Sequence, residues 1–178
     1  MSLFLLEFVP ATAGRPAVDA LLPAVDRAAT AAGGTLIESQ VTGAHDRVFA
    51  VVEAPDAGVL AGRFDGLPGV AGSAGPDEVR LVGADLGALK AARPRAGYLV
   101  EWDLPDGLDM DTYLARKEAK APRYADVPEV SFLRTYVRED MAKCLCFYDA
   151  PGEEDVVRGR KAVDTPIDRL HTLAGEDR

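Results

Sequence analysis

The pattern of apolar and polar positions predicts the same series of elements in each half of the chain. In the first half, a nearly continuous apolar run is interrupted only by Glu7 and has the length of a buried strand. Apolar residues then recur at steps of three and four, which predicts a helix that Pro23 should kink or split. Two alternating runs on either side of a turn predict a hairpin. The elements expected here are a strand over 3–9, a helix from 15 to about 32, strands over 35–41 and 48–53, a short helix over 55–64, a Gly/Pro/Ser-rich loop over 66–76 and a strand over 78–83.

The second half repeats this order. Asp109 is suited to cap its first helix. The inward stripe of that helix contains Tyr113 and Leu114 but also Lys117, which is out of place among apolar residues. The expected elements are a strand over 98–104, a helix over 109–121, strands over 129–137 and 142–148, a helix over 153–162 and a strand over 167–173.

The two halves also agree in detail at a fixed offset. The segment from Lys143 to Pro151 has a weaker copy from Arg47 to Pro55, 96 residues earlier. At the same offset Val137 corresponds to Val41 and Thr135 to Ser39, with no gap between them. We therefore interpret the chain as a tandem duplication.

Each half has the order β-α-β-β-α-β, which is the ferredoxin-like plan of an α+β fold. We predict a first repeat over 1–83, a linker over 84–96 with about one helical turn, a second repeat over 97–174 and a frayed tail over 175–178. A sheet with helices on one face leaves the other face open. We expect the repeats to pack sheet against sheet as an intrachain pseudo-dimer, with a cleft between them as the default site.

The amino-acid composition narrows the classes of binding partner that we expect. A net charge of −9 and a pI near 4.7 disfavour nucleic acid and anionic membranes, which attract clustered Lys and Arg. The sequence has no long apolar run and no signal peptide, so we expect a cytoplasmic protein with reduced cysteines, as a monomeric pseudo-dimer or a homodimer. No phosphate-binding loop or nucleophile elbow occurs, which weighs against nucleotide-dependent chemistry.

Two glutamates stand out as candidate acid–base residues. Glu7 and Glu101 interrupt the first apolar strand of each half, where a carboxylate is costly to bury unless it is paired, protonated or bound to a cation. The plainer alternative is an ion pair with Arg80, Arg134 or Arg169.

Strand alternation predicts which residues would accompany these glutamates. It places Phe132, Arg134 and Tyr136 on the face away from the helices. The corresponding residues of the first half are Leu36, Glu38 and Gln40. Arg134 and Tyr136 are therefore candidates to orient a substrate.

Cys144 and Cys146 lie on one face of a predicted strand, and two such thiolates can share nickel, zinc or copper. Plain packing is the alternative, because the first half has Val48 and Ala50 at these positions. His171, on the last strand, is a candidate for a site, whereas His45 lies in a turn.

The second half resembles a family of small bacterial ferredoxin-like proteins, known as a domain of unknown function, that has a nickel-binding member. The resemblance rests on Tyr98–Glu101, Leu104–Pro105, Cys146–Tyr148 and Pro166–Leu170. It implies a divalent transition metal, nickel above all, with Cys146, Glu101 and His171 as candidate ligands. Family members often have a histidine on the second helix; here that place falls near Gly159 and Arg160. The fold is also similar to the dimeric α+β-barrel group, which includes cofactor-free monooxygenases, cyclases and decarboxylating enzymes.

Two functions follow from these observations. The first is a small-molecule enzyme without a nucleotide cofactor, cyclase-, isomerase- or monooxygenase-like, with Glu101 or Glu7 moving a proton and Arg134 and Tyr136 orienting a polar or enolate-like substrate. The second is a nickel- or transition-metal-binding or sensing protein that uses Cys146, Glu101 and His171.

Overall fold

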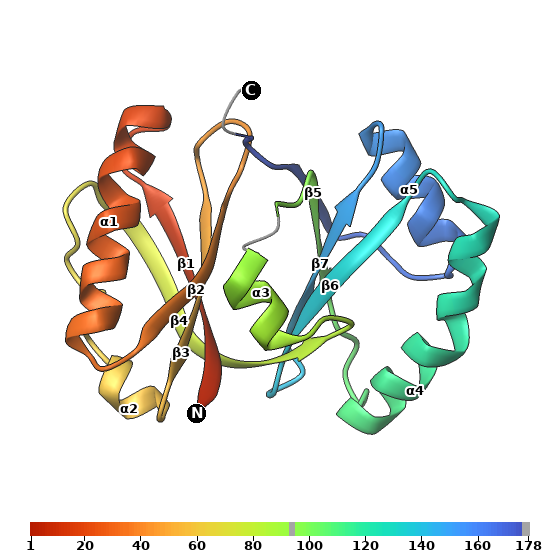
Figure 1. Ribbon diagram of the computed structural model, residues 1–178, viewed down its shortest axis with the longest axis horizontal. Helices are drawn as coiled ribbons and strands as arrows, with labels where there is room; N and C mark the ends of the chain where they lie inside the picture. Colours follow the sequence, from red (N-terminus) through yellow and green to blue (C-terminus); the bar gives the residue numbers. More distant parts are fainter. Residues whose placement is uncertain (93–94, 176–178) are drawn as a thin grey trace. The chain divides into compact units, whose positions relative to one another are not determined.

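The computed structural model describes residues 1–92 and 95–175. Within them the chain forms two compact units; in Figure 1, strands β1 to β3 with α1 and α2 of the first are red to yellow, and β5 to β8 with α4 and α5 of the second are green to blue. Unit 1 holds described residues 1–79, 85–92 and 173–175, and unit 2 holds 80–84 and 95–172. Strands that are hydrogen-bonded neighbours follow the order β2-β3-β1-β4-β6-β7-β5-β8. The fold is therefore a mixed α+β fold with eight strands.

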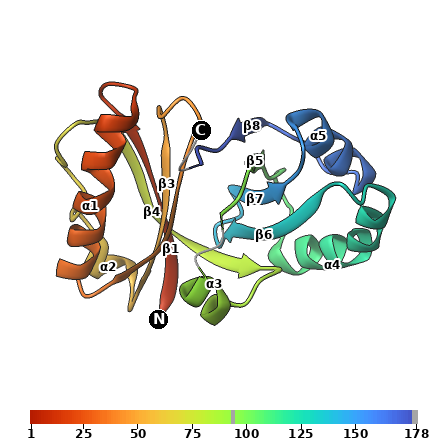
Figure 2. The same ribbon diagram turned by 45° about the horizontal axis from the view of Figure 1, so that its top comes forward.

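Unit 1 has the strand order β2-β3-β1-β4, with β1 paired antiparallel to both β3 and β4. Its helices α1 and α2 lie on one face of these strands (Figure 2). The core on that face contains Phe4, Leu6 and Phe8 from β1 packed against Val25 of α1. The elements are β1 (Ser2–Pro10), α1 (Arg15–Ala31), β2 (Thr35–Val41), β3 (Val48–Ala54), α2 (Ala57–Leu60), β4 (Val70–Val82) and α3 (Leu86–Ala92).

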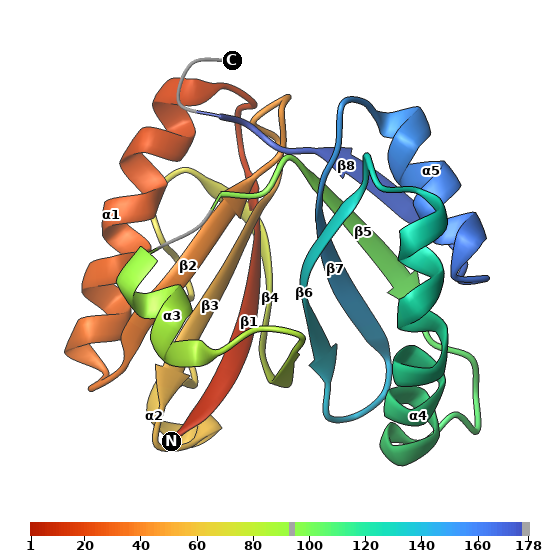
Figure 3. The same cartoon turned by 45° about the vertical axis from the view of Figure 1, so that its right-hand side comes forward.

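Unit 2 repeats the plan, with the strand order β6-β7-β5-β8 and antiparallel pairs throughout. Figure 3 shows α4 and α5 together on one face of its strands. The Asp109 carboxylate accepts a hydrogen bond of 2.7 Å from the Thr112 N–H, so this residue caps α4 as its sequence position predicts. The elements are β5 (Tyr98–Asp103), α4 (Met110–Lys120), the 3-10 helix η1 (Ala121–Asp126), β6 (Ser131–Arg138), β7 (Lys143–Asp149), α5 (Glu153–Ala162) and β8 (Arg169–Thr172).

The structure differs from the local expectations at three places. α1 continues as one helix through Pro23, so the helix is not split there. The stretch expected as a loop over 66–76 belongs in part to β4, because Ala74 and its neighbours pair with β1. The stretch expected as a linker with about one helical turn contains the seven-residue helix α3.

Register irregularities change the faces of two residues. β6 shifts register between Phe132 and Arg134, and β2 shifts between Leu36 and Glu38. Simple alternation places Phe132 and Leu36 away from the helices, but both pack into the helix-side cores. An extra residue in one strand reverses the side on which all later residues point, which explains the error.

Among the described residues, no helix has the length and apolar character needed to span a bilayer.

Candidate functional site

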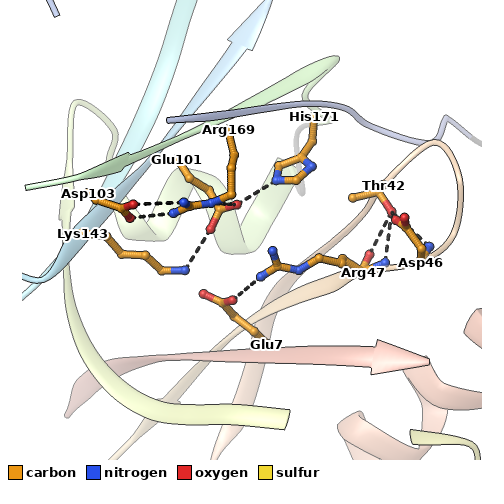
Figure 4. A network of polar contacts seen from close by, with 9 residues as sticks. All are labelled: Glu7, Thr42, Asp46, Arg47, Glu101, Asp103, Lys143, Arg169 and His171. Carbon is orange, nitrogen blue, oxygen red and sulfur yellow. Dashed lines mark hydrogen bonds and ion pairs between the residues drawn. The ribbon is translucent and has the colours of Figure 1, made fainter. Parts of the chain in front are cut away.

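A buried carboxylate lies at the centre of a polar cluster on unit 2. Glu101, on β5, has no exposed surface. One of its oxygens accepts a hydrogen bond from Lys143 Nζ at 2.8 Å. The other lies 2.9 Å from Arg169 Nε and 2.7 Å from His171 Nε2 (Figure 4). Arg169 also forms a two-pronged pair with the exposed Asp103, which fixes the guanidinium in place.

The same contacts determine the protonation of Glu101. Burial alone would raise the pKa of Glu101, but hydrogen bonds from His171, Lys143 and Arg169 outweigh burial and hold that pKa well below its usual range. The carboxylate is therefore ionised at neutral pH. An ionised carboxylate with such a low pKa is a poor general base and cannot act as an acid, so Glu101 supplies a fixed negative charge.

The corresponding carboxylate of unit 1 has a related environment. Glu7, on β1, is 8% exposed and forms an ion pair with Arg47, the residue before β3 (Figure 4). Arg47 and Lys143 are equivalent at the 96-residue offset, so each repeat pairs its strand glutamate with the same basic position. Of the predicted ion-pair partners, Arg169 does bind Glu101, whereas Arg80 pairs with Glu139.

Arg134 and Tyr136 share a face with Glu101. Tyr136 lies opposite Leu145 on β7, which in turn lies opposite Glu101 on β5. Two strand spacings of about 4.8 Å therefore separate Tyr136 from Glu101 along one row. Arg134 lies in the next row, and its guanidinium is 4.8 Å from the centre of the Phe147 ring. Both side chains are buried.

Cys146 is on the opposite face of the same sheet. It belongs with Cys144 to the helix-side core, and its neighbour on β5 is Val100, whereas Glu101 lies opposite Leu145. The three predicted metal ligands are therefore not brought together: Glu101 and His171 are on one side and Cys146 on the other. In the described part of the chain, no group of three or more His, Cys, Asp or Glu side chains is arranged to hold a metal ion.

The two thiols have a polar environment inside the core. Cys144 Sγ and Cys146 Sγ are 3.8 Å apart, Thr135 donates to Cys146 Sγ at 3.2 Å, and Arg160 Nη1 lies 3.5 Å from it. The hydrogen bond from Cys144 lowers the pKa of Cys146, burial opposes this, and the charges of Arg160 and Lys117 lower it further. The guanidinium of Arg160 is thus the cation beside Cys146, so this side of the sheet does not fit a nickel ion bound by Cys146 with Glu101 and His171.

A pocket opens on the helix side of unit 2, lined by α4, η1, the start of the loop after α5, and Trp102 of β5. Its volume is about 300 Å³. Sequence reasoning did not predict it, although Lys117, the misplaced cation on the apolar stripe of α4, is one of its lining residues. Lys143 was also missed as a partner of Glu101; its equivalence to Arg47 was the available signal.

Comparison with solved structures identifies the class of fold. One match is "Putative Chlorite dismutase TA0507", with a TM-score of 0.61 and 16% identity over 98% of this chain and 96% of that chain. A "putative monooxygenase from Lactobacillus acidophilus NCFM" matches with a TM-score of 0.51 and 10% identity over 98% of this chain and 94% of that one. Both are of the dimeric α+β-barrel type, and at these identities the likeness concerns the fold.

The family comparison concerns the second repeat. Residues 98–173 match the model of the family described as "Nickel responsive protein SCO4226-like". This match confirms the resemblance that the sequence suggested for that segment. The search of curated proteins found no match to the chain.

Proposed function

We propose that this protein is a small-molecule enzyme that uses acid–base chemistry without a nucleotide cofactor. The observation that carries the proposal is the 2.7 Å contact between His171 Nε2 and the ionised Glu101 carboxylate. A fixed carboxylate that holds one ring nitrogen of a histidine sets the tautomer and the orientation of the ring. In this proposal His171 moves the proton and Glu101 positions it.

The other predicted residues have supporting roles in this proposal. Arg134 and Tyr136, on the same face as Glu101, would bind the oxygen of a polar or enolate-like substrate as negative charge develops on it. Glu7 has a similar carboxylate position in unit 1, paired with Arg47. The small-molecule partner belongs to the same proposal.

Proton transfer can be tested without knowing the substrate. Acetylacetone and pyruvate in D2O lose hydrogen at the carbon next to the carbonyl when a base abstracts it, and NMR follows this exchange directly. We expect the protein to accelerate the exchange of at least one of these compounds and His171→Asn to abolish the acceleration.

The sequence contains two histidines, so the matched control is His45→Asn. His45 lies in a turn with a positive φ of 57°, a conformation that asparagine tolerates. The proposal fails if the folded wild-type protein gives no exchange above the buffer rate, or if His171→Asn and His45→Asn exchange alike.

A transition-metal response is the second candidate, favoured by the family match over 98–173. Because Cys146 is separated from Glu101 and His171 by the sheet, such a response would depend on the thiol pair of Cys144 and Cys146. Elemental analysis of the purified protein and its melting temperature with and without nickel, zinc or copper test this. A metal-free protein that none of these ions stabilises would remove the candidate.

A further inference from the structure

The pocket on the helix side of unit 2 has a charge opposite to that of the protein as a whole. The chain has a net charge of −9. The pocket lining, however, contains four basic side chains and a single carboxylate, Asp164. That carboxylate is 82% exposed and already paired with Lys120 at 3.3 Å. The basic residues of the lining are Arg116, Lys117, Lys120 and Arg160.

Arg160 is the innermost of these cations and is held rigidly. It is 2% exposed, lies 3.3 Å from the Tyr148 hydroxyl, and donates to the Pro166 carbonyl. Its Nε is buried and finds no acceptor in the described part of the chain. A buried guanidinium with a spare donor favours a negatively charged group nearby, because leaving a buried charged donor unsatisfied costs free energy.

Lys117 accounts for the irregular apolar stripe of α4. Its ammonium lies 4.1 Å from the centre of the Phe132 ring, so the aliphatic stem covers apolar surface while the charge lines the pocket. The residue is out of place only if the face of α4 is regarded as pure core. As part of a pocket wall, it supplies a second cation from a different helix than Arg160.

Aromatic side chains form part of the remaining lining. Trp102 and Tyr113 have ring centres 6.0 Å apart with an interplanar angle of 38°, and Tyr124 lines the same space. Aromatic faces favour a planar ligand body, while charged side chains fix its polar end. A cavity of about 300 Å³ is at the small end of the range for ligand sites.

We propose that this pocket binds a small planar organic anion, such as an aromatic carboxylate, with its charged end among the Arg160, Lys117 and Arg116 side chains and its ring beside Trp102. The site lies on the face of the unit 2 sheet opposite to Glu101 and His171, so it is independent of the proposed proton transfer. Neither the family match nor the fold likeness assigns it.

Trp102 is the sole tryptophan of the chain and lines the pocket, so its fluorescence reports directly on occupancy. The probes are benzoate and benzamide, which share a shape and differ in charge. We expect a saturable change with benzoate and at least tenfold weaker binding of benzamide, since the cations discriminate by charge. Raising the salt concentration should weaken benzoate binding.

Lys117→Met keeps the apolar contact with Phe132 and removes the charge, so benzoate should bind roughly three- to tenfold more weakly and benzamide equally well. The matched control is Lys161→Met, an exposed lysine of α5 outside the pocket lining, which should change neither constant. The proposal is overturned if benzoate gives no saturable change, if benzamide binds as tightly, or if the two lysine variants behave alike. Melting temperatures of both variants verify that they are folded.

Discussion

The two repeats place a glutamate at the same strand position but surround it differently. In unit 1, Glu7 is 8% exposed and pairs with Arg47. In unit 2, Glu101 is fully buried and accepts from Lys143, Arg169 and His171. A basic partner at the equivalent position, Arg47 just before β3 and Lys143 at the start of β7, is common to both, whereas the contacts with Arg169 and His171 come from the last strand of unit 2.

The helix sides of the repeats differ as well. Unit 1 has Ala50 in its apolar core where unit 2 has Cys146 beside Thr135 and Arg160. The two units share a plan of elements, whereas unit 2 has additional polar contacts on both faces of its sheet. Substitutions at equivalent positions of the two units can therefore test which contacts stabilise both units and which matter only in unit 2.

The largest effect should come from removing the buried charge. Glu101→Gln removes the counter-ion bound by the Lys143 ammonium and leaves the Arg169 guanidinium with Asp103 alone, and we expect a loss of about 3 to 5 kcal/mol in the free energy of unfolding. Glu7→Gln should cost about half as much, because its site is less completely buried. Urea denaturation of both variants measures the difference, and equal losses would contradict the contrast between the units.

A second effect appears at acid pH. The pKa of Glu101 is lowered on folding from a value near 4.5, so its contribution to stability is complete above that pH and is lost as the pH falls toward the folded-state pKa. The wild-type protein should therefore lose about 2 kcal/mol more than Glu101→Gln between neutral and strongly acidic pH. Parallel stability curves for the two proteins would show that Glu101 is not linked to acid unfolding.

Replacing the cysteines of unit 2 by the residues at the equivalent positions of unit 1 should have a smaller effect on stability. Cys146→Ala reproduces the residue of unit 1 and removes the acceptor that faces Thr135 and Arg160, which should cost about 1 to 3 kcal/mol. Cys144→Val, which reproduces Val48, is the control and should cost less, because a buried residue of similar size replaces it. Thermal unfolding of the two variants measures the difference. Equal losses would show that the polar contacts of Cys146 contribute nothing beyond packing.

The smallest effect is expected at an exposed pair. Arg80 and Glu139 are 2.9 Å apart, but their side chains are 45% and 34% exposed. Arg80→Gln should change stability by less than about 0.5 kcal/mol, because solvent screens such pairs. If Arg80→Gln lost as much stability as Glu101→Gln, burial would not explain the difference in stability that we expect between the glutamate sites of the two units.

The periodicity of apolar residues was sufficient to predict most of the fold. The repeated β-α-β-β-α-β order, both hairpins and the Asp109 cap follow from local patterns and are present in the structure. The faces of Phe132 and Leu36 could not be predicted, because a register shift adds a residue without any change in the apolar pattern. The helical continuity at Pro23 likewise depends on packing of the flanking apolar residues, Val18, Leu21, Val25 and Ala29.

Site residues could be predicted from the sequence only where the pattern of a single strand was enough to single them out. Glu101 could be named because it interrupts an apolar strand, and His171 because it is the histidine that lies on a predicted strand, and the structure brings them into contact. The structure does not place Cys146 beside them. Which positions on different strands share a face can be predicted only when the strand registers are known. The pocket at Lys117 and Arg160 depends on how two distant helices meet, which no local pattern contains.

The register shifts have a consequence for the history of the chain. One occurs between Leu36 and Glu38 and the other between Phe132 and Arg134, at equivalent places in the two repeats when they are aligned at the 96-residue offset. Two independent insertions would have no reason to coincide, whereas copying a single ancestral gene segment carries the irregular strand along. The shared irregularity therefore supports the interpretation of the chain as a tandem duplication, and it marks equivalent strands in the two units.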